Sequence, residues 1–440
     1  MNVIDIAVII VYLASMSLMG LYFSRRANTT ENYFVGGRSY PADAYKTAYL
    51  RYLICIMLPI GVFIAARWFV PFFRRGKITS VFEYLEGRFG TGARSYGAAV
   101  FIISQCMRLA IIQYLLAILM NKVTGWSPTT CILLGSAVTA YYTVAGGIEA
   151  VVWTDFVQSI ILTFGGLLVL AVIVWKLPDG IGQLFSIGME HGKFGLSEYH
   201  ADTRTLHPID WWGVTLSHKT VFMLLIVGLF QWLAEYSTNQ ENIQKYCASK
   251  TAADARRAMW VCCWMCVPTW LYFMFVGTGL FAFYQVFPEP AATDMLTGAR
   301  KTEEILPHFI TTQLPAGFSG IVVAAVLAAA MSSMSSAMNS ISAVAITDFY
   351  KRHWVRDRDD RHYVRAAKLV TLGSSIVMVA GAFWLLGSEQ KTLQDVWTEL
   401  QSIAAGGLLG LYMLGFFTTR GDGRAVAFGI FFAVCFFVIV

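Results

Sequence analysis

The chain carries a hydroxyl-rich run inside an otherwise apolar stretch. Residues 328–344 read AAAMSSMSSAMNSISAV, with six serines and one asparagine among Ala, Met, Ile and Val. At a helical repeat of about 100° per residue, the polar side chains gather on one narrow flank. The residues on this flank are Ser332, Ser335, Ser336, Asn339 and Ser340, with Ala329 and Ser333 at its edge.

This flank has two interpretations. Small hydroxyl residues allow helix backbones to approach closely in lipid, which would make the flank a packing surface. Alternatively, several uncharged oxygens from hydroxyls and exposed carbonyls hold a weakly polarising cation such as Na⁺. A nearby charge and a transporter architecture would favour the second interpretation.

Asp155 supplies a candidate charge. It lies in VVWTDFVQSIIL, close to the start of an apolar segment. A carboxylate within a membrane span is costly, so it is a functional hypothesis by default. The alternative is a carboxylate at a helix start, where the helix dipole stabilises it.

Arg108 lies deep in the apolar stretch FIISQCMRLAIIQYLLAIL. It is about twelve residues from either end of that stretch, so its side chain cannot easily reach the interface and needs an anionic partner. A guanidinium binds a carboxylate with two parallel hydrogen bonds, which favours a solute carboxylate. A structural pair with an acid such as Glu235, or with a carbonyl, is the alternative.

Three aromatic residues, Phe230, Trp232 and Tyr114, are candidates for hydrophobic gates or for stacking on a solute ring. The chain is 15% aromatic. Ordinary packing and interfacial belts account for most of these side chains, so the solute role competes with a structural one.

The composition places these residues in a membrane protein. The chain has 440 residues, of which 57% are hydrophobic and 14% charged, and its mean hydropathy is +0.58. Such values are typical of an all-α polytopic protein in a lipid bilayer. The apolar spans are 4–24, 49–72, 96–120, 129–145, 150–175, 219–238, 258–286, 317–346, 366–387, 397–417 and 423–440.

The motif content argues against an enzyme. The chain has no Walker-type glycine loop, no GxSxG elbow and no His/Cys cluster with metal-ligand spacing, so an ion gradient is the expected energy source. The net charge of +6 lies in loops, where it indicates orientation and not a nucleic-acid partner. We expect a multi-pass protein of the inner membrane of the cell that acts as a monomer.

The loop charges predict a conflict near the N-terminus. Basic residues follow both the first span (Arg25, Arg26) and the second (Arg74, Arg75), which places both span ends in the cytoplasm. One crossing is then missing between Gly37 and Tyr49, and residues 40–48 would be its outer stub. The chain also stops within an apolar run, which predicts a truncated helix at 423–440.

Several motifs together, and in this order, resemble the sodium:solute symporter family over nearly the whole chain. They are ENYFVGGRS at 31–39, ITSVFEYLEGRFG at 78–90, GGIEAVVWTDFVQ at 146–158, NQENIQKY at 239–246, the serine run, ITDFYKR at 346–352 and GGLLGLYMLGFFTTR at 406–420. The resemblance implies a leucine-transporter-type bundle of two inverted repeats, with solute and ions near the midplane where helices are broken. It divides the single transmembrane domain 1–440 into an extra helix (4–24), an incomplete first repeat (40–177) and a second repeat (217–420).

The resemblance also implies sodium sites. The principal site would use the Ala329 carbonyl, Ser332 and Ser333, and a second site would use Ser332, Ser335, Ser336 and Asp155. In the family the first helix of the first repeat completes the principal site. If that helix is absent here, weak sodium binding is expected.

The solute suggested by the resemblance is an organic anion. An arginine at the position of Arg108 resembles the family's bacterial sialic acid transporters, in which it binds the carboxylate of the sugar acid. The positions where the family's sugar transporters carry a glutamate and an asparagine correspond to Cys55 and Trp232. These residues favour sodium-coupled symport of sialic acid, with Arg108, Phe230 and Trp232 at the solute, over symport of a sugar or a monocarboxylate. A membrane sensor and a non-transporting remnant of the family are the competing hypotheses.

Overall fold

Helices make up almost all of the regular structure. The computed structural model describes residues 3–23, 44–75, 80–200, 205–213, 219–300, 302–387, 407–419 and 421–439. Its helices are α1 (Val3–Phe23), η1 (Tyr49–Arg51), α3 (Tyr52–Ile56), α4 (Leu58–Ile64), η2 (Ala65–Phe69), α5 (Val70–Arg75), α6 (Glu83–Phe89), α7 (Thr91–Thr124), α8 (Pro128–Lys176), α9 (Gly180–Glu190), α10 (Val221–Ser237), α11 (Gln240–Ala248), α12 (Ala252–Val286), α13 (Pro290–Thr297), η3 (Thr302–Glu304), α14 (Ile305–Gln313), α15 (Phe318–Val344), η4 (Ala345–Trp354), α16 (Asp360–Gly387) and α18 (Gly423–Ile439). A short antiparallel hairpin of β1 (Ser197–His200) and β2 (Thr205–Pro208) pairs Ser197 with Pro208.

Six of the described helices are long and apolar enough to cross a membrane. A seventh span is possible if α10 and α11 count as one helix bent by 56°. The break falls at Thr238 and Asn239, where the Asn239 side chain accepts a hydrogen bond from the Glu241 amide and so starts the second segment. The chain thus contains a helix that is broken at the start of the polar motif NQENIQKY.

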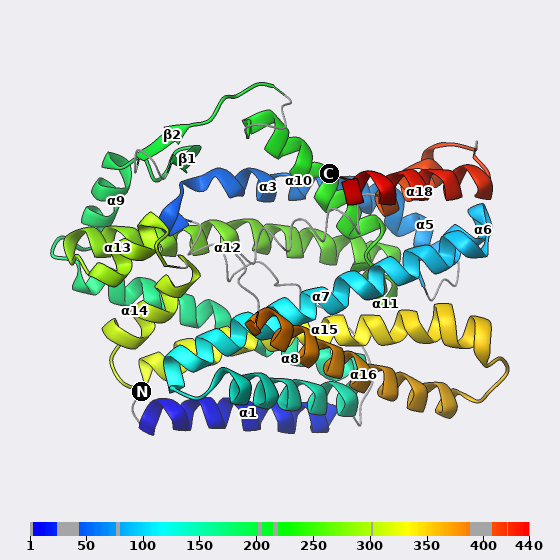
Figure 1. The fold of residues 1–440 in the computed structure, drawn as a ribbon, viewed down its shortest axis with the longest axis horizontal. Coiled ribbons are helices and arrows are strands. Elements are labelled where there is room, and N and C mark those ends of the chain that lie inside the picture. The colour runs from blue at the N-terminus through cyan, green and yellow to red at the C-terminus, as the bar shows by residue number, and fades with distance from the viewer. Residues whose placement is uncertain are drawn as a thin grey trace.

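Helix α15 forms the centre of the bundle. In the most apolar window of its span, 83% of residues are buried, against 33–44% for the other spans. A helix buried on all sides has little contact with lipid, so its serines face other helices. Figure 1 shows α15 lying among α7, α8 and α16.

Helix α8 meets α15 twice. Val138 lines the same small cavity as Leu327 and Met331, and a Cβ on Gly165 would lie 2.4 Å from the Cβ of Ala325. In a straight helix, residues 138 and 165 would be about 40 Å apart at 1.5 Å per residue. Helix α8 therefore doubles back, in agreement with the two spans predicted at 129–145 and 150–175.

The N-terminal helix is joined to the start of α15. The buried Asp5 carboxylate accepts hydrogen bonds from the Gly317 amide (2.6 Å), the Ser319 hydroxyl (2.9 Å) and the Gly320 amide (3.0 Å). These amides have no partner within their own helix, so the carboxylate caps the first turn of α15. A Cβ on Gly320 would lie 2.8 Å from the Asp5 Cα, and glycine allows the two helices to touch.

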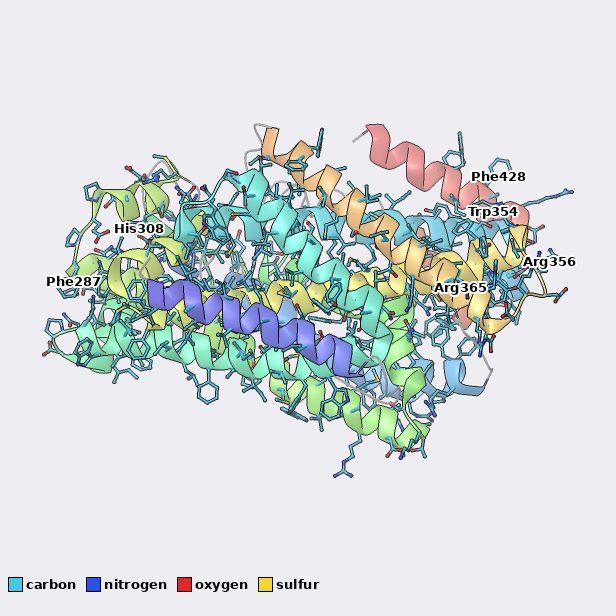
Figure 2. All side chains as sticks on the ribbon, turned by 90° about the horizontal axis from the view of Figure 1, so that it is seen from below. Phe287, His308, Trp354, Arg356, Arg365 and Phe428 are labelled. Carbon is cyan, nitrogen blue, oxygen red and sulfur yellow. The ribbon has the colours of Figure 1, made fainter. Side chains whose placement is uncertain are left out.

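The basic loops gather at one end of the molecule. Arg356 and Arg365 lie at one end and His308 at the other (Figure 2). Arg94, which begins α7, bonds Asp348 of η4, and Arg74 at the end of α5 bonds backbone carbonyls of residues 246, 247 and 250. The described parts of the loops predicted to share the cytoplasmic side thus lie together.

The predicted conflict in topology is present. Helix α1 runs alongside α15 in the same direction, since Asp5 meets its start and Tyr12 reaches Met331. The span 49–74 ends near Ser80, which bonds Asp348 beyond the end of α15, so it runs the same way as α1. The missing crossing is predicted between Gly37 and Tyr49, and residues 37–43 of this segment lie outside the described residues.

Residues 44–48 of the predicted outer stub are firmly held. The Tyr45 hydroxyl donates to the Ala292 carbonyl over 2.8 Å. The buried Lys193 ammonium donates to the carbonyls of Tyr45 (2.7 Å), Lys46 (3.3 Å) and Thr47 (3.3 Å). It also lies 3.9 Å from the centre of the Phe281 ring.

Candidate functional site

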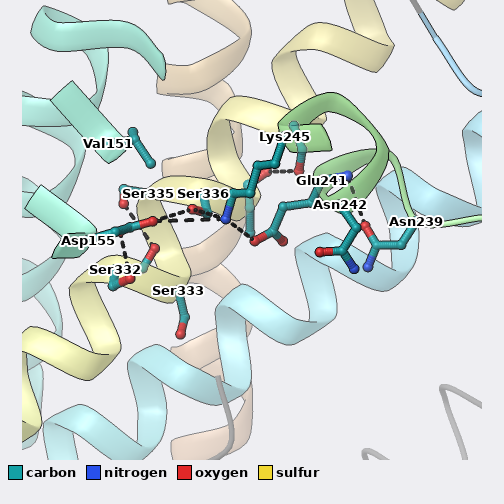
Figure 3. Close-up of polar contacts among 12 residues, drawn as sticks. Val151, Asp155, Asn239, Glu241, Asn242, Lys245, Ser332, Ser333, Ser335 and Ser336 are labelled. Carbon is teal, nitrogen blue, oxygen red and sulfur yellow. Dashed lines mark hydrogen bonds and ion pairs between the residues drawn. The ribbon is translucent and has the colours of Figure 1, made fainter. Parts of the chain in front are cut away.

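The serine flank of α15 faces the carboxylate of Asp155 (Figure 3). The Ser332 hydroxyl donates to Oδ1 over 2.6 Å, and the Ser336 hydroxyl donates to Oδ2 over 3.1 Å. The Ser335 hydroxyl donates to the Ser332 carbonyl over 3.0 Å. Asp155 is only 1% exposed, so the structure places a buried carboxylate among three of the serines selected from the sequence.

A second pair of charges adjoins this carboxylate. The Lys245 ammonium lies 4.0 Å from Asp155 Oδ2 and donates to the Ser336 hydroxyl over 3.3 Å. On its other side it lies 3.3 Å from Glu241 Oε1. Glu241 Oε2 in turn lies 3.3 Å from Arg108 Nη1. A continuous chain of charges therefore runs from Arg108 to the serines of α15.

The residues of the predicted principal sodium site lie next to this cluster. The Ser333 hydroxyl donates to the Ala329 carbonyl over 3.0 Å, so these two oxygens are neighbours. Ser333 points away from Asp155 (Figure 3), while Ser332 bonds the carboxylate. The two predicted sites thus occupy adjacent sides of two successive turns of α15.

Arg108 uses only part of its guanidinium in these contacts. Within the described part of the chain, its hydrogen bonds to Glu241 (3.3 Å) and Gln105 (3.4 Å) both use Nη1. A guanidinium carries five donors in a fixed fork, so Nε and Nη2 are available for a bidentate ligand. Its carboxylate partner is Glu241, while Glu235, the partner considered from the sequence, accepts bonds from Asn239 and Asn242.

The candidate aromatic residues are divided between environments. Phe230 is 51% exposed, whereas Trp232 and Tyr114 are buried. The Trp232 indole stacks on Trp270 at 5.3 Å and donates its NH to the Ile54 carbonyl over 2.9 Å. These contacts join α10 to α3 and α12, which is a packing role, and a solute role for Phe230 and Trp232 stays a prediction.

A separate ionic cluster closes the end of the molecule that carries the basic loops. The buried Asp348 carboxylate accepts from Ser80 and from Arg94, each over 2.6 Å. Arg94 also bonds Glu86 over 2.6 Å, and Glu86 accepts from Arg352 over 3.0 Å. The hydrogen bonds from Arg352 and then from Arg94 lower the pKa of Glu86 below its usual value. This cluster ties α6 and α7 to η4.

Sequence reasoning missed Glu241 and Lys245. They lie in the quoted motif NQENIQKY at positions i and i+4, the spacing at which an acid and a base pair on one helix face. That pairing could have been read from the sequence. Their approach to Arg108 and Asp155 could not, because it depends on the bend between α10 and α11.

Comparisons with known proteins all point to one family. A profile of the sodium:solute symporter family matches residues 12–430. The chain is 31% identical to the sodium/sialic acid symporter SiaT of Proteus mirabilis, over 98% of this chain and 88% of SiaT. It is 29% identical to the sodium/sialic acid symporter NanT of Aliivibrio fischeri, over 95% of this chain and 84% of NanT.

Solved structures give the same fold. The substrate-bound, outward-open structure of a Na⁺-coupled sialic acid symporter superposes with a TM-score of 0.83 at 28% identity, covering 100% of this chain and 97% of that one. MhsT in complex with L-phenylalanine superposes with a TM-score of 0.51 at 14% identity, covering 96% of each chain, which supports the fold alone. The predicted all-α, leucine-transporter-type bundle is confirmed.

Proposed function

We propose that the solute of this chain is an organic anion and that sialic acid is the best single candidate. The premise is that the chain belongs to the sodium:solute symporter family and is a sodium-coupled symporter. The relatives SiaT and NanT are sodium/sialic acid symporters. These two relatives, at 31% and 29% identity, favour the same solute for this chain.

The observation that carries the proposal is the position of Arg108. Its guanidinium is 11% exposed and lies near the middle of α7. The fork formed by Nε and Nη2 is suited to a carboxylate, and a desolvated cation at this depth strongly favours an anionic ligand. Arg108 is the proposed solute-binding residue, with Trp232 and Phe230 as further candidates.

Sodium would bind on the serine flank of α15. The Ala329 carbonyl, Ser332 and Ser333 are the proposed ligands of the principal ion. Ser332, Ser335, Ser336 and Asp155 form a second cation-binding group. Because the Asp155 cluster connects to Arg108 through Glu241 and Lys245, ion and solute would stabilise each other's binding in the outward-open state.

Uptake into proteoliposomes tests this function. Radiolabelled N-acetylneuraminate is expected to accumulate when a sodium gradient is imposed and to equilibrate without accumulation when choline replaces sodium. Unlabelled glucose and lactate are the competitors, and only an unlabelled sialic acid is expected to reduce uptake. Uptake that ignores the sodium gradient would contradict symport, while competition by glucose or lactate would redirect the solute assignment.

A further inference from the structure

We propose that the Lys245 ammonium is the resident cation of the group formed by Asp155, Ser332, Ser335 and Ser336, so that no sodium ion binds at the Asp155 carboxylate. The inference rests on the proposed function for the identity of the competing ion. It concerns a residue that the sodium-site assignment does not include.

The position of the ammonium supports this assignment. Lys245 Nζ lies 3.3 Å from the Ser336 hydroxyl oxygen and 4.0 Å from Asp155 Oδ2. It approaches from α11, and Figure 3 shows its side chain extending between Asp155 and Glu241. The Lys245 side chain is 16% exposed and Asp155 only 1%. In such surroundings an ion pair is screened much less than at a surface.

The charges of the cluster support the same conclusion. Arg108 and Lys245 are positive, Glu241 and Asp155 are negative, and the four side chains together are neutral. A sodium ion on Asp155 would leave a buried excess of one positive charge, which is unfavourable in a poorly solvated site. One sodium ion at the principal site together with one solute carboxylate at Arg108 would keep the region neutral.

The chain offers a structural reason for the placement of Lys245. Helix α11 starts after the 56° break that follows α10, and the break directs this short helix toward α15. Glu241 and Lys245 lie four residues apart on α11 and are joined by an ion pair of 3.3 Å. The pair holds the ammonium beside Ser336, so sodium would have to displace a cation that is part of the chain.

Equilibrium binding of ²²Na⁺ to the purified chain tests the inference without relying on transport. We expect Asp155→Asn to leave the number of bound sodium ions unchanged, because the carboxylate already has its cation. Lys245→Met is expected to bind one additional sodium ion per chain, and the double variant Lys245→Met/Asp155→Asn is expected to lose it. Lys245→Arg, which retains the charge, is the matched control and is expected to bind as the unchanged chain does.

A second variant guards against a failure to fold. Lys245→Gln removes the ammonium but keeps a hydrogen-bonding side chain beside Ser336, and it too is expected to gain one sodium ion. Loss of a bound sodium ion from Asp155→Asn alone would overturn the inference, as would the absence of any gain in both Lys245→Met and Lys245→Gln. If the unchanged chain bound no sodium while Lys245→Met bound one, the inference would stand and the proposed function would fail.

Discussion

At the residue scale, the chemistry of this chain depends on oxygens that surround a buried carboxylate. Asp155 is bonded by Ser332 at 2.6 Å and by Ser336 at 3.1 Å. Ser333 and the Ala329 carbonyl lie on the adjacent side of the same helix. Two successive turns of α15 therefore offer two sets of oxygens, and only the set around Asp155 lies beside the ammonium of Lys245.

Replacing Ser333 tests the principal sodium group. We expect Ser333→Ala to raise the sodium concentration for half-maximal uptake about tenfold, because loss of one ligand oxygen costs about 1.4 kcal/mol of binding free energy. The measurement is sodium-dependent solute uptake into proteoliposomes. Ser342→Ala is the matched control, since the Ser342 hydroxyl donates to the Ala367 carbonyl on α16. Equal sodium dependence in the two variants would contradict the assignment.

Replacing Arg108 tests the solute group. Lysine keeps the charge but loses the two-pronged donor arrangement, so Arg108→Lys should raise the KM for N-acetylneuraminate about ten- to a hundredfold. The control is Arg300→Lys, because Arg300 is 42% exposed and its Nη2 lies 3.5 Å from Glu304. A lowered melting temperature with an unchanged KM would instead identify Arg108 as a structural partner of Glu241.

At the element scale, two features determine how the sites are assembled. The bend between α10 and α11 brings Lys245 to α15, and the reversal within α8 brings Asp155 to the same helix. Separately, the cluster of Ser80, Glu86, Arg94, Asp348 and Arg352 ties the start of α7 to η4, which directly follows α15. The polar side chains of α15 and η4 are thus fixed by helices distant in sequence.

The buried member of this end cluster should matter most for stability. Asp348→Asn is expected to lower the melting temperature by several degrees, because it leaves Arg94 without its fully buried carboxylate partner. Thermal unfolding in detergent is the measurement. Glu198→Gln should change it little, since the pair of Glu198 and Lys219 is 34% and 54% exposed. Similar losses in both variants would contradict a special role for Asp348.

The same cluster should make the stability of the folded chain sensitive to acid. Hydrogen bonds from Arg352 and Arg94 lower the pKa of Glu86 in the folded chain. Its contribution to stability is therefore complete above the ordinary carboxylate pKa and is lost as the pH falls through the lowered value. Melting temperatures measured from neutral pH downward should fall more steeply for the unchanged chain than for Glu86→Gln. Parallel pH profiles would count against this contribution.

At the scale of the whole molecule, the features that depend on one local sequence pattern could be predicted from the sequence. Long apolar runs predicted the helices, and the helical wheel of the serine run identified Ser332, Ser335 and Ser336 as one flank, which the structure places at or beside Asp155. The hairpin of β1 and β2 was not predicted. The place of Lys245 also escaped prediction, because it depends on the angle between two helices.

The orientation of the molecule gives a further prediction. Thr312 and Arg356 are exposed. The Thr312 hydroxyl donates to the carbonyl of His308, and His308 and Arg356 lie toward opposite ends of the molecule in Figure 2. In a cysteine-free background and right-side-out vesicles, a membrane-impermeant maleimide should label Thr312→Cys and spare Arg356→Cys. Inverted vesicles should give the reverse pattern. Labelling of Arg356→Cys from outside would overturn the predicted orientation.

The cap that Asp5 places on α15 has a mechanical consequence. Three hydrogen bonds and a glycine contact couple α1 to the first turn of the central helix. Rotation of α15 alone would break these three hydrogen bonds and separate the buried carboxylate from the amides that it caps. Helices α1 and α15 should therefore move, or stay still, as one rigid lever. The N-terminal helix, which is predicted to lie outside both repeats, would then restrict the movement of the central helix.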